Sequence, residues 1–105
     1  MKANFRVLTR AGKTFCDLGA TLDLRAAPPL KAAMLRALDK QRPLTLDASS
    51  VERLSTACIQ LLVACGSAFK NAGHALTLSE PSESFSAAFA DLGLEPELQQ
   101  WINEA

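Results

Sequence analysis

The stretch from Pro43 to Phe69 constrains the fold more than any other part of the chain. Leu44, Thr45 and Leu46 form a short apolar run with a β-branched centre, and such a run between turn residues predicts a buried strand. Further along, apolar residues recur at spacings of three and four, which places them on one face of a helix. These residues are Cys58, Leu61, Leu62, Cys65, Ala68 and Phe69. The sequence therefore predicts a buried strand followed by a core-facing helix.

The loop between this strand and this helix ends in two hydroxyl side chains. Val51 and Leu54 are apolar and can anchor the loop to the core. Ser55 or Thr56 is placed to cap the helix, because a hydroxyl oxygen accepts hydrogen bonds from the free N–H groups of a first helical turn. We therefore expect both hydroxyls to lie where the helix begins.

The segment before this stretch is expected to form a hairpin and a helix. Residues 4–9 alternate between polar and apolar side chains, and the pattern resumes in residues 14–18. The two runs predict an antiparallel hairpin in which Gly12 adopts a positive φ. Prolines 28 and 29 suit the first turn of a helix, and apolar residues recur behind them at helical spacing to near Lys40.

The segment after the central helix adds one more strand and two helices. Residues 75–78 form a second short apolar run, which is typical of a strand covered on both faces. Ser82 is placed to cap a helix that Gly93 ends, and Pro96 begins a last short helix. The elements together predict an α/β fold. Its mixed four-stranded sheet has a short N-terminal antiparallel pair and a parallel β-α-β unit, and about four helices cover it.

Length and charge restrict the functions that such a chain can have. The 105 residues are expected to form a single domain, 1–105, because two cores of this size would each be too small. Eleven basic side chains balance eleven acidic ones, so we expect neither nucleic-acid binding nor direct membrane insertion. No apolar stretch approaches the ~20 residues of a spanning helix, so we expect a cytoplasmic protein.

The sequence contains no convincing catalytic or metal-binding set of residues. The three cysteines make an odd count without a CxxC pair, and they are expected to be reduced core residues. His74 is the only histidine, and only Asp47 and Glu52 among the carboxylates could be neighbours. We therefore expect no enzyme, no cofactor and no metal site.

The region around the central helix resembles the STAS domain of bacterial anti-sigma-factor antagonists and their relatives. In that family a strand ends in Asp, and the helix after a short loop opens roughly Asp-Ser-Ser-Gly-Leu. Here the strand ends at Asp47 and the helix opens at 55–59 with Ser-Thr-Ala-Cys-Ile. Residues 89–94 also resemble the closing Leu-x-x-x-Gly-Leu pattern of the family. The resemblance covers roughly the whole chain. Ala57 stands where the family usually has its phosphoacceptor serine.

The resemblance implies a bacterial signalling adaptor rather than an enzyme. In the family, a kinase-like partner phosphorylates the loop serine, which breaks one complex and permits another; this mechanism is called partner switching. The partner here would be a serine kinase that is also an anti-sigma factor, or a kinase of a chemotaxis or two-component pathway. Thr56 or Ser55 would replace the missing acceptor, or neither is modified and the domain docks constitutively.

An alternative function follows from the same resemblance. STAS subunits of ABC phospholipid transporters carry a threonine at the position of Thr56, and they bind the ATPase subunit through this helix and loop. The exposed side of the central helix would be formed by Gln60, Val63, Ser67 and Lys70. Whether the domain forms a homodimer stays open. For any protein partner, the expected contact residues are Asp47, Ser49, Ser50, Glu52, Ser55, Thr56, Ala57, Gln60 and Val63.

Overall fold

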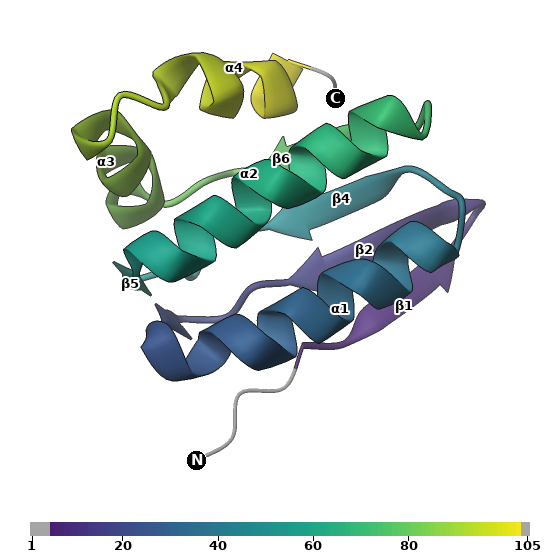
Figure 1. The fold of residues 1–105 in the computed structure, drawn as a ribbon, viewed down its shortest axis with the longest axis horizontal. Helices are drawn as coiled ribbons and strands as arrows, with labels where there is room; N and C mark the ends of the chain where they lie inside the picture. The colour runs from purple at the N-terminus through teal and green to yellow at the C-terminus, as the bar shows by residue number, and fades with distance from the viewer. Residues whose placement is uncertain (1–4, 104–105) are drawn as a thin grey trace.

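A mixed four-stranded sheet forms the centre of the computed structural model, which describes residues 5–103 (Figure 1). The strands lie in the order β1-β2-β4-β6, which are Val7–Arg10, Lys13–Asp17, Leu44–Asp47 and Leu76–Ser79. β1 pairs with β2 in antiparallel orientation, whereas β2, β4 and β6 run parallel. This arrangement confirms the predicted sheet. The predicted start of the first strand at Asn4 lies outside the described residues.

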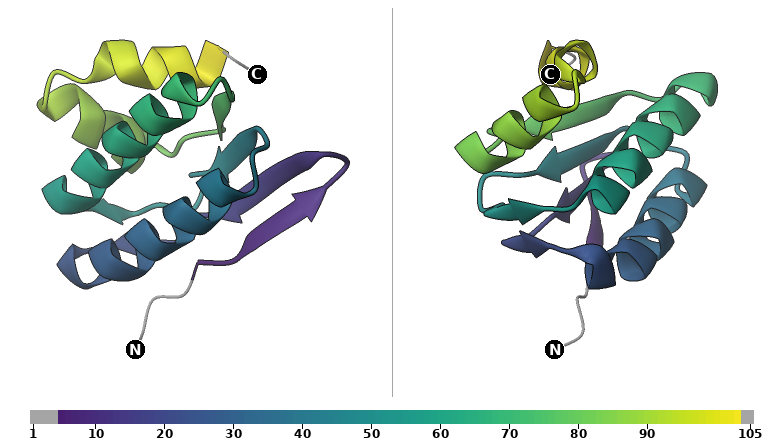
Figure 2. Two further views of the ribbon diagram at one scale, coloured as in Figure 1. Left: turned by 45° about the vertical axis from the view of Figure 1, so that its right-hand side comes forward. Right: turned by 60° about the vertical axis from the view of Figure 1, so that its left-hand side comes forward.

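Two helices cover one face of this sheet, and two more lie near the edge of the sheet that β6 forms. α1 (Ala27–Asp39) and α2 (Thr56–Asn71) lie side by side across the face (Figures 1 and 2). α3 (Glu83–Asp91) and α4 (Glu95–Asn103) lie beside them, with α4 in contact with β6. These are the four predicted helices. A short 3-10 helix, η1 (Leu24–Ala26), precedes α1.

Local signals in the sequence set the ends of these elements. Both prolines lie in the first turn of α1, where a missing N–H group has no structural cost. Ser82 caps α3, because its Oγ accepts from the N–H of Phe85 at 3.1 Å. Gly12 and Gly93 have φ angles of 79° and 71°, which glycine adopts readily. These positions confirm the predicted turn, helix cap and helix end.

A second, very small sheet was not predicted. β3 (Thr21–Leu22) pairs in parallel with β5 (Arg53–Leu54), which lies in the loop expected between the central strand and helix. Strands of two residues are too short to show an alternating pattern. The pairing joins the segment before α1 to the segment before α2, so it fixes the loop that follows β4.

The core lies between the sheet and its helices. Alternate strand residues point toward the helices and are buried: Thr14, Cys16, Leu44, Leu46, Leu76 and Leu78. α2 contributes a buried face of Cys58, Ile59, Leu62, Cys65 and Phe69. This face differs from the predicted one because Ile59 is buried, whereas Leu61 and Ala68 are only half-buried. The latter two lie toward α1, at the margin of the core.

A tryptophan holds α4 against α2. Trp101 is 5% exposed, and its ring meets the ring of Phe89 edge-on at a centroid distance of 5.5 Å. A Cβ atom built on Gly66 would lie 2.8 Å from Cζ2 of this indole. Glycine at position 66 is therefore what allows the indole to approach the backbone of α2.

We expect Gly66→Ala to lower the stability of the protein. Alanine is favoured over glycine in a helix by roughly 1 kcal/mol, but here the added methyl group would displace a buried ring. Overpacking of this kind costs about 1 to 3 kcal/mol. Urea denaturation should therefore show a lower free energy of unfolding. In a Trp101→Ala background the same substitution should become stabilising, and a stabilising effect in the native background would contradict the contact.

The three cysteines are buried free thiols. Burial raises the pKa of Cys16 to about 11, with a smaller contribution from the charge of Asp17. Burial likewise raises the pKa of Cys65 to about 12, and it raises the pKa of Cys58. Because the thiolate is the nucleophile, these groups are poor nucleophiles in the folded protein.

The raised pKa values predict a loss of stability at alkaline pH. Above the ordinary thiol pKa of 9.0, the unfolded chain loses protons that folded Cys16 and Cys65 retain. The free energy of unfolding should therefore fall between about pH 9 and 11, by about 1.4 kcal/mol per pH unit for each thiol. The chain has no tyrosine to add to this titration. Cys65→Ala should reduce the slope, because it removes one of the titrating thiols, and a flat profile in the native protein would contradict the prediction.

Candidate partner-docking site

The loop from Asp47 to Thr56 leaves the carboxyl end of the central strand β4. Its first turn is closed by Asp47, whose Oδ1 accepts from the Ser49 hydroxyl at 2.7 Å and from the Ser49 N–H at 3.0 Å. These hydrogen bonds, the hydroxyl first, hold the pKa of the Asp47 carboxyl below its usual value. The exposed carboxylate therefore stays charged and orders the turn.

The inner side of the loop is fixed to the core. Ala48 and Val51 are buried, with exposed fractions of 0% and 1%. The Ser82 hydroxyl donates to the carbonyl of Val51 at 2.6 Å, and the Ser82 N–H donates to the carbonyl of Ala48 at 3.1 Å. The same serine that caps α3 thus also holds the loop from Asp47 to Thr56.

The outer end of the loop is fixed to the segment before α1. The N–H of Glu52 donates to the carbonyl of Ala20 at 2.7 Å, and the N–H of Ser55 donates to the carbonyl of Leu22 at 2.7 Å. With both ends bonded, the loop is a rigid support for its exposed side chains. Those side chains are Asp47, Ser49, Ser50, Glu52 and Arg53.

The structure separates the roles of the two predicted hydroxyls. Ser55 is half-buried, and its Oγ accepts from the N–H of Cys58 at 3.2 Å, which makes it the N-cap of α2. Thr56 is the first residue of the helix; its side chain is exposed and has no hydrogen-bond partner within residues 5–103. Thr56 is therefore the hydroxyl that another protein can reach.

The 3-10 helix η1 lies beside the start of α2, a contact that was not predicted from the sequence. The Cys58 thiol donates to the carbonyl of Asp23 at 3.4 Å. The Asp23 carboxylate caps η1 and pairs with Arg25 at 3.1 Å, and hydrogen bonding from Arg25 lowers the pKa of this carboxyl. Leu24, between them, is 72% exposed. No spacing in the sequence connects these residues to α2, because the β3–β5 pairing brings them together.

The expected contact residues divide into two groups. Asp47, Ser49, Ser50, Glu52, Thr56 and Gln60 are exposed, and Ser55, Ala57 and Val63 are half-buried. The expectation that Val63 is exposed, like Ser67 and Lys70, was wrong. Val63 packs against the core and lines a hollow beneath α4, because α4 covers this flank of α2. The other residues of the exposed side lie as expected.

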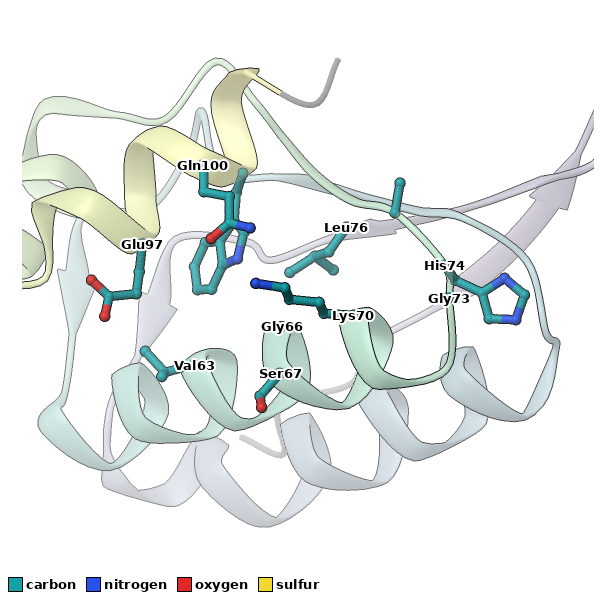
Figure 3. A pocket seen from close by; sticks show the side chains of 11 residues that line it. Val63, Gly66, Ser67, Lys70, Gly73, His74, Leu76, Glu97 and Gln100 are labelled. Atoms are coloured by element: carbon teal, nitrogen blue, oxygen red, sulfur yellow. The ribbon is translucent and has the colours of Figure 1, made fainter.

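The hollow beneath α4 has a volume of about 480 Å³ and a mixed lining. Lys70 extends into it below α4, and Glu97 and Gln100 face it from α4 (Figure 3). The ring of His74 points away from the hollow (Figure 3), and its Nε2 lies 3.1 Å from Gln41 Oε1. The single histidine therefore does not face the Ser67 hydroxyl, and the hollow has no paired nucleophile and base.

The described residues contain neither a metal-binding cluster nor a helix that could span a membrane. Between Phe5 and Asn103, no three His, Cys, Asp or Glu side chains lie close enough together to hold a metal ion. No helix in the same range is long and apolar enough to cross a membrane.

The sequence matches a family model described as "Mlab, STAS domain" over residues 11–100. The chain therefore belongs to the STAS domain family, as its resemblance and its fold indicated. No curated protein matches it significantly.

Solved structures with the same fold include three of anti-sigma factor antagonists. SpoIIAA in its unphosphorylated form has a TM-score of 0.72 and 17% identity, over 88% of this chain and 83% of that one. The phosphorylated form of Bacillus SpoIIAA has a TM-score of 0.69 and 16% identity, over 88% and 86%. An anti-sigma factor antagonist from Mycobacterium paratuberculosis has a TM-score of 0.71 and 22% identity, over 90% and 80%. These similarities establish the fold.

The different roles of the two hydroxyls predict different effects on stability. Ser55→Ala removes the N-cap of α2 and should lower the free energy of unfolding by about 1 kcal/mol. Thr56→Ala removes only an exposed hydroxyl and should change it by less than about 0.5 kcal/mol. Urea denaturation of both variants measures the difference. Equal losses would show that Ser55 is not the cap in solution.

Proposed function

We propose that the protein is a non-enzymatic bacterial signalling adaptor of the cytoplasm. It docks a kinase-like or anti-sigma partner through the loop Asp47 to Thr56 and the start of α2. The observation that carries this proposal is the position of Thr56, exposed at the first turn of α2 beside a rigid loop. Membership of the STAS family and the shared fold with anti-sigma factor antagonists support a partner-switching role.

Thr56 is the best candidate for a regulatory phosphate. Ala57 cannot be phosphorylated, and the Ser55 hydroxyl accepts the capping hydrogen bond of α2. A phosphate on Thr56 would lie at the positive end of the helix dipole, which stabilises an exposed anion by up to ~1 kcal/mol. SpoIIAA has been solved in both an unphosphorylated and a phosphorylated form, and that precedent supports phosphorylation here.

The same position explains how one modification could change the partner. A phosphate adds a charge of about −2, and burying it in an interface without cationic groups is strongly unfavourable. A partner that covers unmodified Thr56 would therefore be released when the threonine is phosphorylated. If Thr56 is never modified, the same surface serves as a constitutive docking site.

A second candidate is a STAS subunit that regulates the ATPase of an ABC phospholipid transporter. The specific observation in its favour is the threonine itself, because those subunits carry a threonine at the position of Thr56. Both candidates use the same surface, so the identity of the bound partner distinguishes them. Neither requires catalysis, and the buried thiols with raised pKa values agree with a binding role.

Thr56→Glu should abolish partner binding without unfolding the protein. A permanent carboxylate at the first turn of α2 imitates the charge of a phosphate in the interface. Because the side chain is exposed, the melting temperature should change by no more than about 4 °C. The tagged protein is used to capture its partner from a lysate of its source organism, and mass spectrometry identifies what is bound. The matched control is Gln99→Glu, which adds the same charge at an exposed position of α4 rather than of α2.

Each result of this capture has a definite meaning. Loss of a kinase or anti-sigma factor with Thr56→Glu supports the adaptor, and loss of a transporter ATPase supports the second candidate. Normal binding by Thr56→Glu would show that this loop is not the docking site. Phosphorylation by the captured kinase should add the mass of one phosphate to the tryptic peptide Leu54–Lys70, and Thr56→Ala should prevent it.

A further inference from the structure

The outer face of α2 has an unusual composition for a surface helix. From Thr56 to Phe69 it contains no charged side chain, and its first charge is Lys70. The exposed positions are neutral and mostly small: Thr56, Gln60, Ala64 and Ser67. Surface helices ordinarily present charged and polar residues to water. A neutral face with small side chains would instead allow another helix to approach closely.

An apolar groove runs between this face and α1. Its deeper part has a volume of about 230 Å³. Apart from Lys31, the lining is formed by uncharged, predominantly apolar residues: Met34, Leu35 and Leu38 from α1, and Leu61, Ala64, Cys65 and Ala68 from α2. Past Lys31 and Leu61 the groove continues into a shallower part, lined by Ala27, Pro28, Ala57 and Gln60. It therefore reaches Ala57, in the first turn of α2 and next to Thr56.

A strongly exposed large apolar side chain, Leu35, lies on the α1 side of the groove. It lines the groove and is 58% exposed. Full burial of a leucine side chain is worth about 1.5 to 3 kcal/mol. Together with the apolar lining, Leu35 forms a patch of the kind that marks interaction sites.

We propose that this groove binds an amphipathic helix of the docking partner. The partner helix places its apolar stripe on Leu35, Leu61 and Ala64, and it places an acidic side chain against Lys31. This proposal rests on the proposed function, because the groove opens at the docking loop and extends that surface along α2.

Length and charge define the partner segment. The α1 side of the groove extends from Pro28 to Leu38, or ~15 Å of helix, which matches a partner helix of about three turns with anchors at i, i+3 or i+4, and i+7. Lys31 is the only charged residue in the lining of either part. It makes no salt bridge within residues 5–103, where the Arg25–Asp23 pair is the only one. An acidic residue on the partner would complement it.

A display library of randomised helical peptides of about four turns, panned against the full chain, tests the groove directly. The expected peptides carry apolar residues at i, i+3 or i+4, and i+7, with an acidic residue at a fixed offset. Leu35→Lys should weaken their binding at least about tenfold. The matched control is Leu92→Lys, because Leu92 is also exposed, at 45%, but lies at the end of α3. That variant should bind normally.

A charge reversal provides a second, independent readout. The Lys31→Glu variant should no longer bind the acidic peptides, and panning against it should enrich basic ones. A protein that is only destabilised would not show this reversal. Failure to enrich amphipathic peptides, or equal binding by Leu35→Lys, would overturn the proposal. Concentration-dependent self-association that Leu35→Lys removes would also overturn it, because a second copy would then fill the groove.

The groove proposal and the proposed function can be tested separately. A selected peptide that fills only the groove should bind Thr56→Glu with less than about a threefold loss, because position 56 lies outside its lining. If peptide binding requires Leu35 but the captured partner binds Thr56→Glu normally, the groove proposal is supported and the proposed function is wrong. If the partner requires Thr56 but no peptide is enriched, the proposed function stands and the groove proposal is wrong.

Discussion

The structure depends on the burial of β4 between two parallel neighbours. Leu44 and Leu46 are completely buried, so the backbone of this strand must find its hydrogen-bond partners within the protein. It finds them in β2 and β6, whose register places Asp47 beside Asp17 and Ser79. The end of β4 is thereby fixed in space, and the loop that follows it starts from a rigid support.

α2 is the element on which the remaining surfaces meet. One side of it forms the core, and Gly66 on a second side receives the ring of Trp101. A third side, from Ala57 to Ala68, faces α1 across the apolar groove. Its N-terminus, capped by Ser55, presents Thr56 to solvent. One helix therefore joins the core to both surfaces proposed to bind a partner.

Much of the fold could be predicted because its signals are local. Alternation in the strands, proline in the first turn of α1, and the serine cap at Ser82 depend only on neighbouring residues. The sequence placed Ser55 and Thr56 at the start of α2 but did not decide which of them is the cap. The β3–β5 pair could not be predicted, because two-residue strands have no measurable period. Val63 was misassigned because its partial burial depends on α4, which begins more than thirty residues further along the chain.

The sequence by itself determined the four main strands, the four α-helices, their order and the family, because periodicity, caps and the motif around the central helix depend on residues close together in the chain. Tertiary structure decided which side of α2 each neighbour covers. It separated the cap Ser55 from the accessible Thr56, placed η1 beside Cys58, and left Leu35 exposed along a groove. These features arise from contacts between segments far apart in sequence, and side-chain packing between such segments leaves no periodic signal in either one.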